Sequence, residues 1–340
     1  MKKSLRILVI VSLILLGWAL WLILGSATRF KDKEKILYVG LGENEKTFVM
    51  QKLRDSGFIR NLAMFELIGN QMGVWEKLQP GRYAISKGMS ILKLVRNLRN
   101  HHQSPVQLTI TKLRTKEQLA ALLDRKTMYK TDDFLNLLRD SAFTGKYRLD
   151  TNTIMTSIFP NTYEILWTTK PEAILDKLAK QRNVFWSETR KQKARQLQKT
   201  QEEIYILASI VEEETNQNDE KPIIASVYLN RLNKNMYLGA DPTVKYALRN
   251  FGLKRILFVH ISSSASNPYN TYRNKGLPPG PICTPSEASI DAVLNAAKTD
   301  YLFFCAQPGG TGYHNFASNE TAHFQNAKKY QQWLNSRNIK

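Results

Sequence analysis

The stretch "KTQEEIYILASIVEEETNQND", residues 199–219, places an apolar run directly before three consecutive glutamates. Thr200 and Glu203 stand at the spacing of a capping box, in which each side chain bonds the backbone N–H of the other residue. This spacing predicts a helix that begins near Gln201 and continues through Val211. The helix phase is then fixed, so the direction of each following side chain can be predicted.

The three glutamates differ in that phase. At 3.6 residues per turn, Glu214 continues the apolar stripe that includes Leu207 and Val211. Glu212 and Glu213 flank the stripe, so we expect both to reach water. A carboxyl on an apolar stripe loses solvation, which raises its pKa and suits a general acid. The alternative is a hydrated helix end, although three negative charges there oppose the helix dipole.

The chain is long and strongly basic. Its 340 residues, 43% of them hydrophobic, allow two or three domains with a real core. The net charge of +20 calls for an acidic partner, such as nucleic acid, anionic lipid or an anionic polymer. The two cysteines, Cys283 and Cys305, exclude a disulfide framework or a zinc cluster, and we interpret both as small buried hydrophobes.

The first 33 residues predict a membrane anchor. Lys2, Lys3 and Arg6 precede an apolar run from Ile7 to about Gly25, which is long enough for a transmembrane helix. The basic leading side predicts a single-pass protein of the inner (cytoplasmic) membrane with an extracytoplasmic body. A cleaved signal peptide is the alternative. An extracytoplasmic body disfavours nucleic acid as a partner, and no nucleic-acid-binding motif is found in the sequence.

Two further regions have more than one interpretation. Residues 37–104 read as strand, helix, helix, strand and helix, a small domain that either binds and positions a partner or only serves as a spacer. The helical stretch from Pro171 to about Gln198 is rich in Lys and Arg. It is either a solvated surface or a contact for an anionic polymer or lipid.

Rigid, polar loops follow the three glutamates. Asp241 is expected to cap a helix whose first residue is Pro242. The loop over 267–289 contains five prolines and carries Tyr269, Asn270 and Tyr272. Loops held this firmly often carry function. His314, in a Gly-rich turn, has no metal-ligand partner at suitable spacing, so we expect no metal.

With these residues the chain resembles the endolytic murein transglycosylases, the YceG-like (MltG) family. The resemblance rests on several motifs, which are E-x-E-T at Glu212, Glu214 and Thr215, N-R-L at Asn230 and Arg231, D-P-T-V-x-Y at Asp241 and Thr243, Y-N-T-Y at Tyr269 to Tyr272, G-L-P-P-G-P-I at 276–282 and H-x-F at His314. Where the family has F-P-D-T-Y, this chain has Asn161 before Tyr163, which removes a charge but keeps a hydrogen-bonding group.

The resemblance implies an α+β fold in three parts. These are a cytoplasmic tip and single transmembrane helix over 1–28, a LysM-like α/β subdomain over 37–104 and a mixed α+β YceG-like catalytic domain over 105–340. It also implies that Glu214 is the catalytic acid and that no cofactor is needed. Glu212 would tune Glu214 or orient substrate, or else be a solvated helix residue. Secondary or substrate-binding positions implied by the motifs are Asn161, Tyr163, Thr215, Asn230, Arg231, Asp241, Thr243, Tyr269, Asn270, Tyr272 and His314.

The implied activity is that of a lyase, a lytic transglycosylase that cleaves peptidoglycan glycan strands and leaves 1,6-anhydro ends. Such cleavage would terminate nascent glycan elongation. The expected partners are glycan strands and the cytoplasmic membrane, with peptidoglycan synthases of the elongation machinery as further candidates. Two alternatives stay open, namely a hydrolase that uses water and a peptidoglycan-binding scaffold without catalysis.

Overall fold

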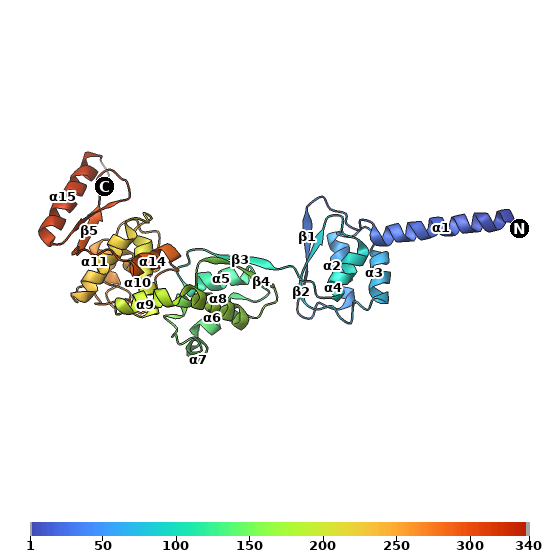
Figure 1. Ribbon diagram of the computed structural model, residues 1–340, viewed down its shortest axis with the longest axis horizontal. Coiled ribbons are helices and arrows are strands. Elements are labelled where there is room, and N and C mark those ends of the chain that lie inside the picture. The colour runs from blue at the N-terminus through green and yellow to red at the C-terminus, as the bar shows by residue number, and fades with distance from the viewer. Residues whose placement is uncertain (1, 338–340) are drawn as a thin grey trace. The chain divides into compact units, whose positions relative to one another are not determined.

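The computed structural model describes residues 2–337, apart from the side chains at positions 2–4, 19 and 22. The chain divides into two compact units (Figure 1). The first consists of Met1–Leu108 together with the segments Asp124–Tyr129 and Glu164–Lys170. The second consists of Thr109–Leu123, Lys130–Tyr163 and Pro171–Lys340. The sequence predicted a single boundary near residue 104 and did not predict the two short segments that return to the first unit.

The first unit confirms the predicted order of strand, helix, helix, strand and helix. Its elements are α1 (Lys2–Leu24), β1 (Glu34–Val39), α2 (Lys46–Ser56), α3 (Leu62–Gln71), β2 (Gly81–Ser86) and α4 (Ile91–Arg99). Strands β1 and β2 pair antiparallel, with Glu34 opposite Ser86 and Val39 opposite Gly81. Alternate residues of both strands and the apolar faces of α2, α3 and α4 form one buried cluster. The LysM-like assignment of this unit stays a prediction.

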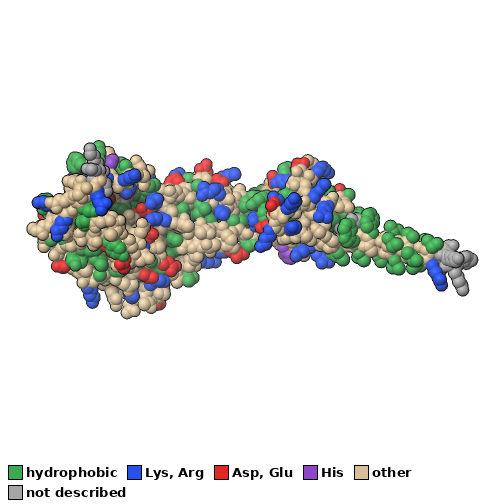
Figure 2. Space-filling view, turned by 90° about the horizontal axis from the view of Figure 1, so that it is seen from above, with side chains coloured by type: hydrophobic (Ala, Val, Ile, Leu, Met, Phe, Trp, Pro, Cys, Tyr) green, Lys and Arg blue, Asp and Glu red, His purple; other side chains and the backbone are tan. Residues whose placement is uncertain are grey.

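Helix α1 carries exposed apolar side chains along its length, including Leu5, Trp18 and Trp21 (Figure 2). A membrane span needs about 20 consecutive, mostly apolar residues. Within the described residues, no helix combines that length with sufficient apolarity. The transmembrane anchor over 1–28 and the single-pass inner-membrane location stay predictions.

The second unit is mostly helical. Its first elements are β3 (Val106–Ile110), α5 (Lys116–Asp124), α6 (Thr131–Arg139), α7 (Ser141–Gly145), the 3₁₀ helix η1 (Ile154–Ser157) and β4 (Asn161–Ile165). Some of these elements include residues at the division between the two units. Strands β3 and β4 form a two-stranded sheet. The helices that follow are α8 (Pro171–Phe185), α9 (Glu188–Gln196), α10 (Gln201–Glu214), α11 (Lys221–Asn233), α12 (Asp241–Ala247), α13 (Phe258–Ser263) and α14 (Glu287–Leu294). The chain continues with an antiparallel pair, β5 (Phe303–Ala306) and β6 (His314–Ala317), and with α15 (Glu320–Ser336).

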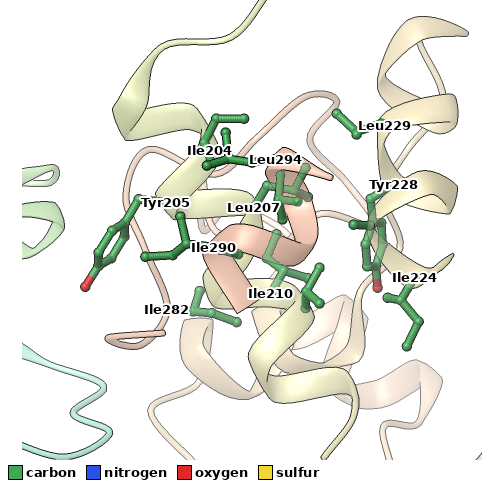
Figure 3. Close-up of a cluster of buried hydrophobic side chains, with 14 of the residues drawn as sticks. Ile204, Tyr205, Leu207, Ile210, Ile224, Tyr228, Leu229, Ile282, Ile290 and Leu294 are labelled. Atoms are coloured by element: carbon green, nitrogen blue, oxygen red, sulfur yellow. The ribbon is translucent and has the colours of Figure 1, made fainter. Parts of the chain in front are cut away.

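Helix α10 is the centre of this unit. Every residue from Ile204 to Val211 is buried, because α9, α11, α12, α14 and η1 all pack against the helix. Figure 3 shows Ile204, Tyr205 and Ile210 leaving α10 in different directions into one apolar cluster. The predicted apolar stripe is therefore correct, but burial extends all round the helix instead of being confined to that stripe.

The boundaries of α10 follow from local chemistry. Glu203 N donates to Thr200 Oγ1 at 3.1 Å, and Thr200 N donates to Glu203 Oε2 at 2.8 Å, which confirms the predicted capping box. At the other end the helix stops at Glu214, because Thr215 has an extended backbone. Cys283 is buried against this helix as expected, with its thiol 3.4 Å from Ser209 O, whereas Cys305 is only half-buried.

One predicted cap is wrong. The cap of α12 is Ala240, and Asp241 is the first residue of the helix. Pro242 has no backbone N–H, so one of the donors that a capping side chain would satisfy is missing here. The first turn therefore forms without a capping side chain. The Asp241 carboxylate is consequently free to make other contacts.

The capping box gives a direct test of how α10 is held. Replacement of Thr200 by Ala removes the hydroxyl acceptor for Glu203 N, and we expect the free energy of unfolding to fall by about 1 kcal/mol. Urea denaturation of the whole chain measures this change. Thr200→Ser keeps the hydroxyl and should stay close to the parent protein. Equal stability of the Ala and Ser variants would contradict the assigned cap.

Candidate active site

A cavity of about 190 Å³ opens beside the end of α10. Three helices, two loops and strand β5 contribute its walls. Its lining residues are Glu214, Tyr228, Arg231, Leu238, Gly239, Asp241, Tyr272 and Phe304. Glu214, Arg231, Asp241 and Tyr272 were predicted from the sequence, and they come together here although they lie far apart in the chain.

Glu214 is held as an acid with an unusual pKa. Burial is the largest influence and raises the pKa of its carboxyl from 4.5 to about 7. The negative charge of Asp241 acts in the same direction. A hydrogen bond donated by the Tyr228 hydroxyl opposes this rise, as do the positive charges of Lys245 and Arg231. The carboxyl therefore changes its protonation near neutral pH, where a general acid and base is most effective.

Tyr228 was missed by the sequence reasoning. It lies on α11, is almost fully buried, and donates its hydroxyl to Glu214 Oε1. A buried tyrosine needs a partner for its hydroxyl, and a helix surrounded by apolar residues offers few. The only hint in the sequence was its position two residues before the N-R-L motif.

The walls of the cavity are fixed by hydrogen bonds. Tyr272 donates its hydroxyl to Asp241 Oδ1 at 2.6 Å. Arg231 donates to Leu302 O and Leu238 O, each at 2.6 Å, so its guanidinium joins two loops that border the cavity. Gly239, which follows Leu238 in one of these loops, has a φ of 59°, and a Cβ there would lie 3.3 Å from Arg231 Nη1. Glycine is therefore the residue that fits this turn.

Glu212 does not face the cavity. Its carboxylate accepts hydrogen bonds from Ser286 Oγ at 2.7 Å and from the Ser289 hydroxyl, and Lys221 Nζ lies 3.3 Å away. Although burial alone would raise it, these partners leave the pKa of Glu212 below its ordinary value. Its side chain is 15% exposed, so it is not the solvated helix residue of the alternative interpretation. Glu212 connects α10 to the start of α14.

Glu213 is also not hydrated, which makes the prediction that it reaches water wrong. Arg114 Nε and Nη2 donate to its two carboxylate oxygens at 3.1 and 3.0 Å, and Lys112 Nζ lies 3.4 Å away. The helix phase predicted only which direction this side chain takes. The two cations come from a segment about a hundred residues earlier, which no local pattern could show.

Several predicted substrate-binding residues have structural roles instead. Asn270 is fully buried and bonds Ile261 O and Ser264 Oγ, and Thr243 is fully buried with its hydroxyl 2.6 Å from Ala240 O. Direct hydrogen bonds from these two residues to a sugar are therefore excluded in this conformation. Asn230 bonds the carbonyls of Thr299 and Tyr301, and so positions the loop before β5.

The remaining predicted residues lie outside the cavity lining. Thr215 Oγ1 accepts from Gln217 N, Tyr163 is buried with its hydroxyl on Phe159 O, and Asn161 is exposed. Tyr269 packs against Tyr246 with ring centroids 4.5 Å apart and ring planes tilted by 39°. His314 Nδ1 lies 2.9 Å from the buried Glu220, and its ring meets the edge of Phe304, which lines the cavity. Among the described residues, no cluster of side chains could hold a metal ion.

Comparison with known proteins decides the family. The model of the YceG-like family matches residues 39–329. The chain belongs to the YceG-like family. An endolytic murein transglycosylase of Bacillus subtilis (strain 168) is 32% identical over 248 residues, which cover 68% of each chain. A protein of the same name from Streptococcus pneumoniae (strain R6) is 28% identical over 334 residues, and the match spans 88% of this chain and 59% of the relative.

A solved YceG-like structure supports the fold. The crystal structure of a YceG-like protein from Listeria monocytogenes matches with a TM-score of 0.58 at 26% identity. The match covers 86% of this chain and 98% of that chain. The mixed α+β fold that the sequence predicted is therefore the fold of a YceG-like protein.

Tyr228 gives a test of the electrostatics of the cavity. Because its hydroxyl donates to the ionised form of Glu214, Tyr228→Phe should raise the pKa of Glu214 above about 7. Carbon-13 NMR titration of the glutamate carboxyl carbons measures the change, with the Glu214 signal identified by its absence in Glu214→Gln. Tyr163→Phe, which removes a hydroxyl outside the cavity, should leave that pKa unchanged. A lower pKa in Tyr228→Phe would contradict the assigned hydrogen bond.

The same carboxyl should leave a signature in stability. The folded-state pKa of about 7 lies above the ordinary value of 4.5, so the folded chain binds the extra proton between these values. The stability that protonated Glu214 contributes is present below pH 4.5 and is lost as the pH rises through 7. Relative to Glu214→Gln, the parent protein should lose up to about 1.4 kcal/mol per pH unit in that window. Urea denaturation at several pH values tests this, and a constant difference would contradict it.

Proposed function

We propose that this chain is an endolytic peptidoglycan lytic transglycosylase, a lyase that cleaves the bond between N-acetylmuramic acid and N-acetylglucosamine within glycan strands. The observation that carries the proposal is one carboxyl, Glu214, whose pKa of about 7 lets it both give and accept a proton. Membership of the YceG-like family and relatives named endolytic murein transglycosylase support the same reaction.

The first step requires an acid. Protonated Glu214 donates its proton to the glycosidic oxygen, so the bond from that oxygen to C1 of the muramic acid breaks and the N-acetylglucosamine leaves as an alcohol. Positive charge develops on the muramic acid ring in the transition state. Glu214 becomes a carboxylate in this step, and the Tyr228 hydroxyl stabilises that carboxylate through its hydrogen bond.

The second step requires a base, and the same group supplies it. The Glu214 carboxylate accepts the proton of the 6-hydroxyl of the same muramic acid while that oxygen attacks C1. The product is a 1,6-anhydro ring, and Glu214 returns to its protonated state. Because the nucleophile belongs to the sugar itself, its effective concentration is high and no water molecule has to be positioned.

The other polar groups of the cavity hold the shape in which this occurs. Arg231 is bound to two loop carbonyls and Asp241 to the Tyr272 hydroxyl, so neither side chain needs to reorganise during the reaction. Arg231 also lowers the pKa of Glu214, whereas Asp241 raises it. These two smaller effects oppose one another, and burial remains the main cause of a pKa near neutrality.

A second candidate is a hydrolase that uses water, and one observation favours it. Asp241 is a second carboxylate in the lining of the same cavity, as hydrolases with an acid and a base require. However, its Oδ1 atom already accepts the Tyr272 hydroxyl at 2.6 Å. The two reactions leave different ends, because hydrolysis gives reducing sugars and transglycosylation gives 1,6-anhydro sugars.

Mass spectrometry of glycan digests tests the proposal. The parent protein should release fragments with 1,6-anhydro ends, and Glu214→Gln should lower the rate by a factor of about 100 to 10,000 or more, since amide nitrogen cannot transfer the proton. Glu320→Gln, on the exposed surface of α15, is the matched control and should keep full activity. Reducing ends from the parent protein would favour the hydrolase.

The neighbouring glutamates sharpen this test. Glu213→Gln should reduce stability, since it breaks the pair with Arg114, but should leave the products and most of the rate intact. Glu212→Gln should behave in the same way, because its partners belong to α14 and Lys221 and not to the cavity. Loss of activity in a folded Glu213→Gln with retention in Glu214→Gln would overturn the assignment of the acid.

A further inference from the structure

A second and larger cavity lies in the same unit, at the opposite end of α10. Its volume is about 570 Å³. It shares no lining residue with the cavity around Glu214. Its lining residues are Lys146, Tyr147, Arg148, Ala179, Arg182, Asn183, Trp186, Lys191, Gln201 and Glu202. Four of these side chains are cationic and one is a carboxylate, so the cavity is strongly basic.

The single carboxylate does not neutralise the cavity. Glu202 is engaged in an ion pair with Arg182, whose side chain is only 15% exposed. Lys191 pairs with Glu188 at 2.7 Å, but that carboxylate is 79% exposed and can be displaced at low cost. In the described part of the chain, neither Lys146 nor Arg148 has a carboxylate within ion-pair distance, and Lys146 lies 4.9 Å from the centre of the Phe143 ring.

The ion pairing of the cavity cations differs from that of Arg190, a basic residue outside the cavity lining. Arg190, on α9, is satisfied internally, because its Nε and Nη2 each lie 2.8 Å from an Asp291 oxygen. Within the cavity, in contrast, Lys146 and Arg148 are exposed beside a buried aromatic residue, Trp186. Such a cavity offers unpaired cations, which suit a ligand that carries carboxylates.

The position of the cavity fits a long substrate. Glu202 at the start of α10 and Glu214 at its end are separated by twelve residues, or about 18 Å along the helix axis. A polymer that places one bond at Glu214 and follows the protein surface toward the start of α10 would present acidic groups to this cavity. A single glycan strand with acidic side groups at regular intervals meets that requirement.

We propose that this cavity is an anion-binding exosite for the peptide stems of the glycan strand, which it recognises through their carboxylates. The proposal rests on the proposed function, because it assigns the ligand from the substrate of that reaction. It also decides between the two interpretations of the basic stretch at 171–198. Arg182 and Lys191 contribute to a polymer contact, whereas Arg190 contributes to the fold.

Binding measurements test the exosite separately from catalysis. In a Glu214→Gln background, fluorescence anisotropy would compare labelled glycan strands that carry peptide stems with strands from which the stems have been removed. Lys146→Gln combined with Arg148→Gln should weaken binding of the peptide-bearing strands about tenfold, which corresponds to two lost charge contacts. It should leave binding of the peptide-free strands unchanged. Higher salt should reduce the difference, since exposed charges are screened.

A matched control removes one lysine and one arginine outside the cavity. Lys180 on α8 and Arg195 on α9 are both exposed, and neither lines the cavity. Lys180→Gln combined with Arg195→Gln lowers the net charge equally and should bind both kinds of strand like the parent. Thermal unfolding of each variant confirms that the fold is intact.

Other results would overturn the exosite. Equal weakening for both kinds of strand would mean that the cavity contacts the glycan backbone. No weakening, or an equal loss in the control pair, would mean that the cavity cations bind no stem. Selective loss of binding to a phosphate-bearing polymer would assign the site to another ligand. If the parent protein formed no anhydro ends but the stem-dependent binding persisted, the proposed reaction would fail while the exosite stood.

Discussion

Desolvation of one carboxyl is the constraint on which this structure depends. Helix α10 is enclosed on every side by five neighbouring elements, and Glu214 is its last residue. A carboxylate at this point has lost much of its water, and within the described residues it gains only one hydrogen bond, from Tyr228. The enclosure therefore shifts the pKa of Glu214 toward neutral pH, and the surrounding loops border the cavity beside it.

The three consecutive glutamates show how strongly partners govern chemistry. All three are shielded from solvent to some degree, so burial alone does not distinguish them. Glu212 is surrounded by two hydroxyls and an ammonium, which favour its charged form, and Glu213 is paired with a guanidinium. Glu214 faces a cavity and a phenol, and its neutral form is favoured up to about pH 7. Three identical side chains in one helical turn therefore have different roles. Two of them make structural contacts, and the third is the acid.

The two cavities lie at opposite ends of α10, so the helix sets the distance between them. Its fourteen residues form a rigid, fully packed element, so the separation between the acid and the basic cavity is fixed. A substrate contact at one end then constrains where the bond at the other end is placed. Remote binding energy of this kind can position a reacting group without adding any contact at the scissile bond.

The sequence by itself determined the local features of this protein. The capping box fixed the start and phase of α10, the phase placed Glu214 in line with the apolar stripe, and the motif spacing indicated the family and four residues of the cavity. These signals are local because they depend on hydrogen bonds and helical periodicity within a few residues.

Only the tertiary structure decided which polar groups meet. Arg114 reaches Glu213 from 99 residues away, Ser286 reaches Glu212 from 74 residues away, and the basic cavity is assembled from four separate segments. Tyr228 reaches Glu214 from the next helix, and Asn270 and Thr243 turn inward to support the loops that surround the cavity. The pKa of a carboxyl depends on every atom within a few ångströms of it, and packing of distant segments supplies most of those atoms.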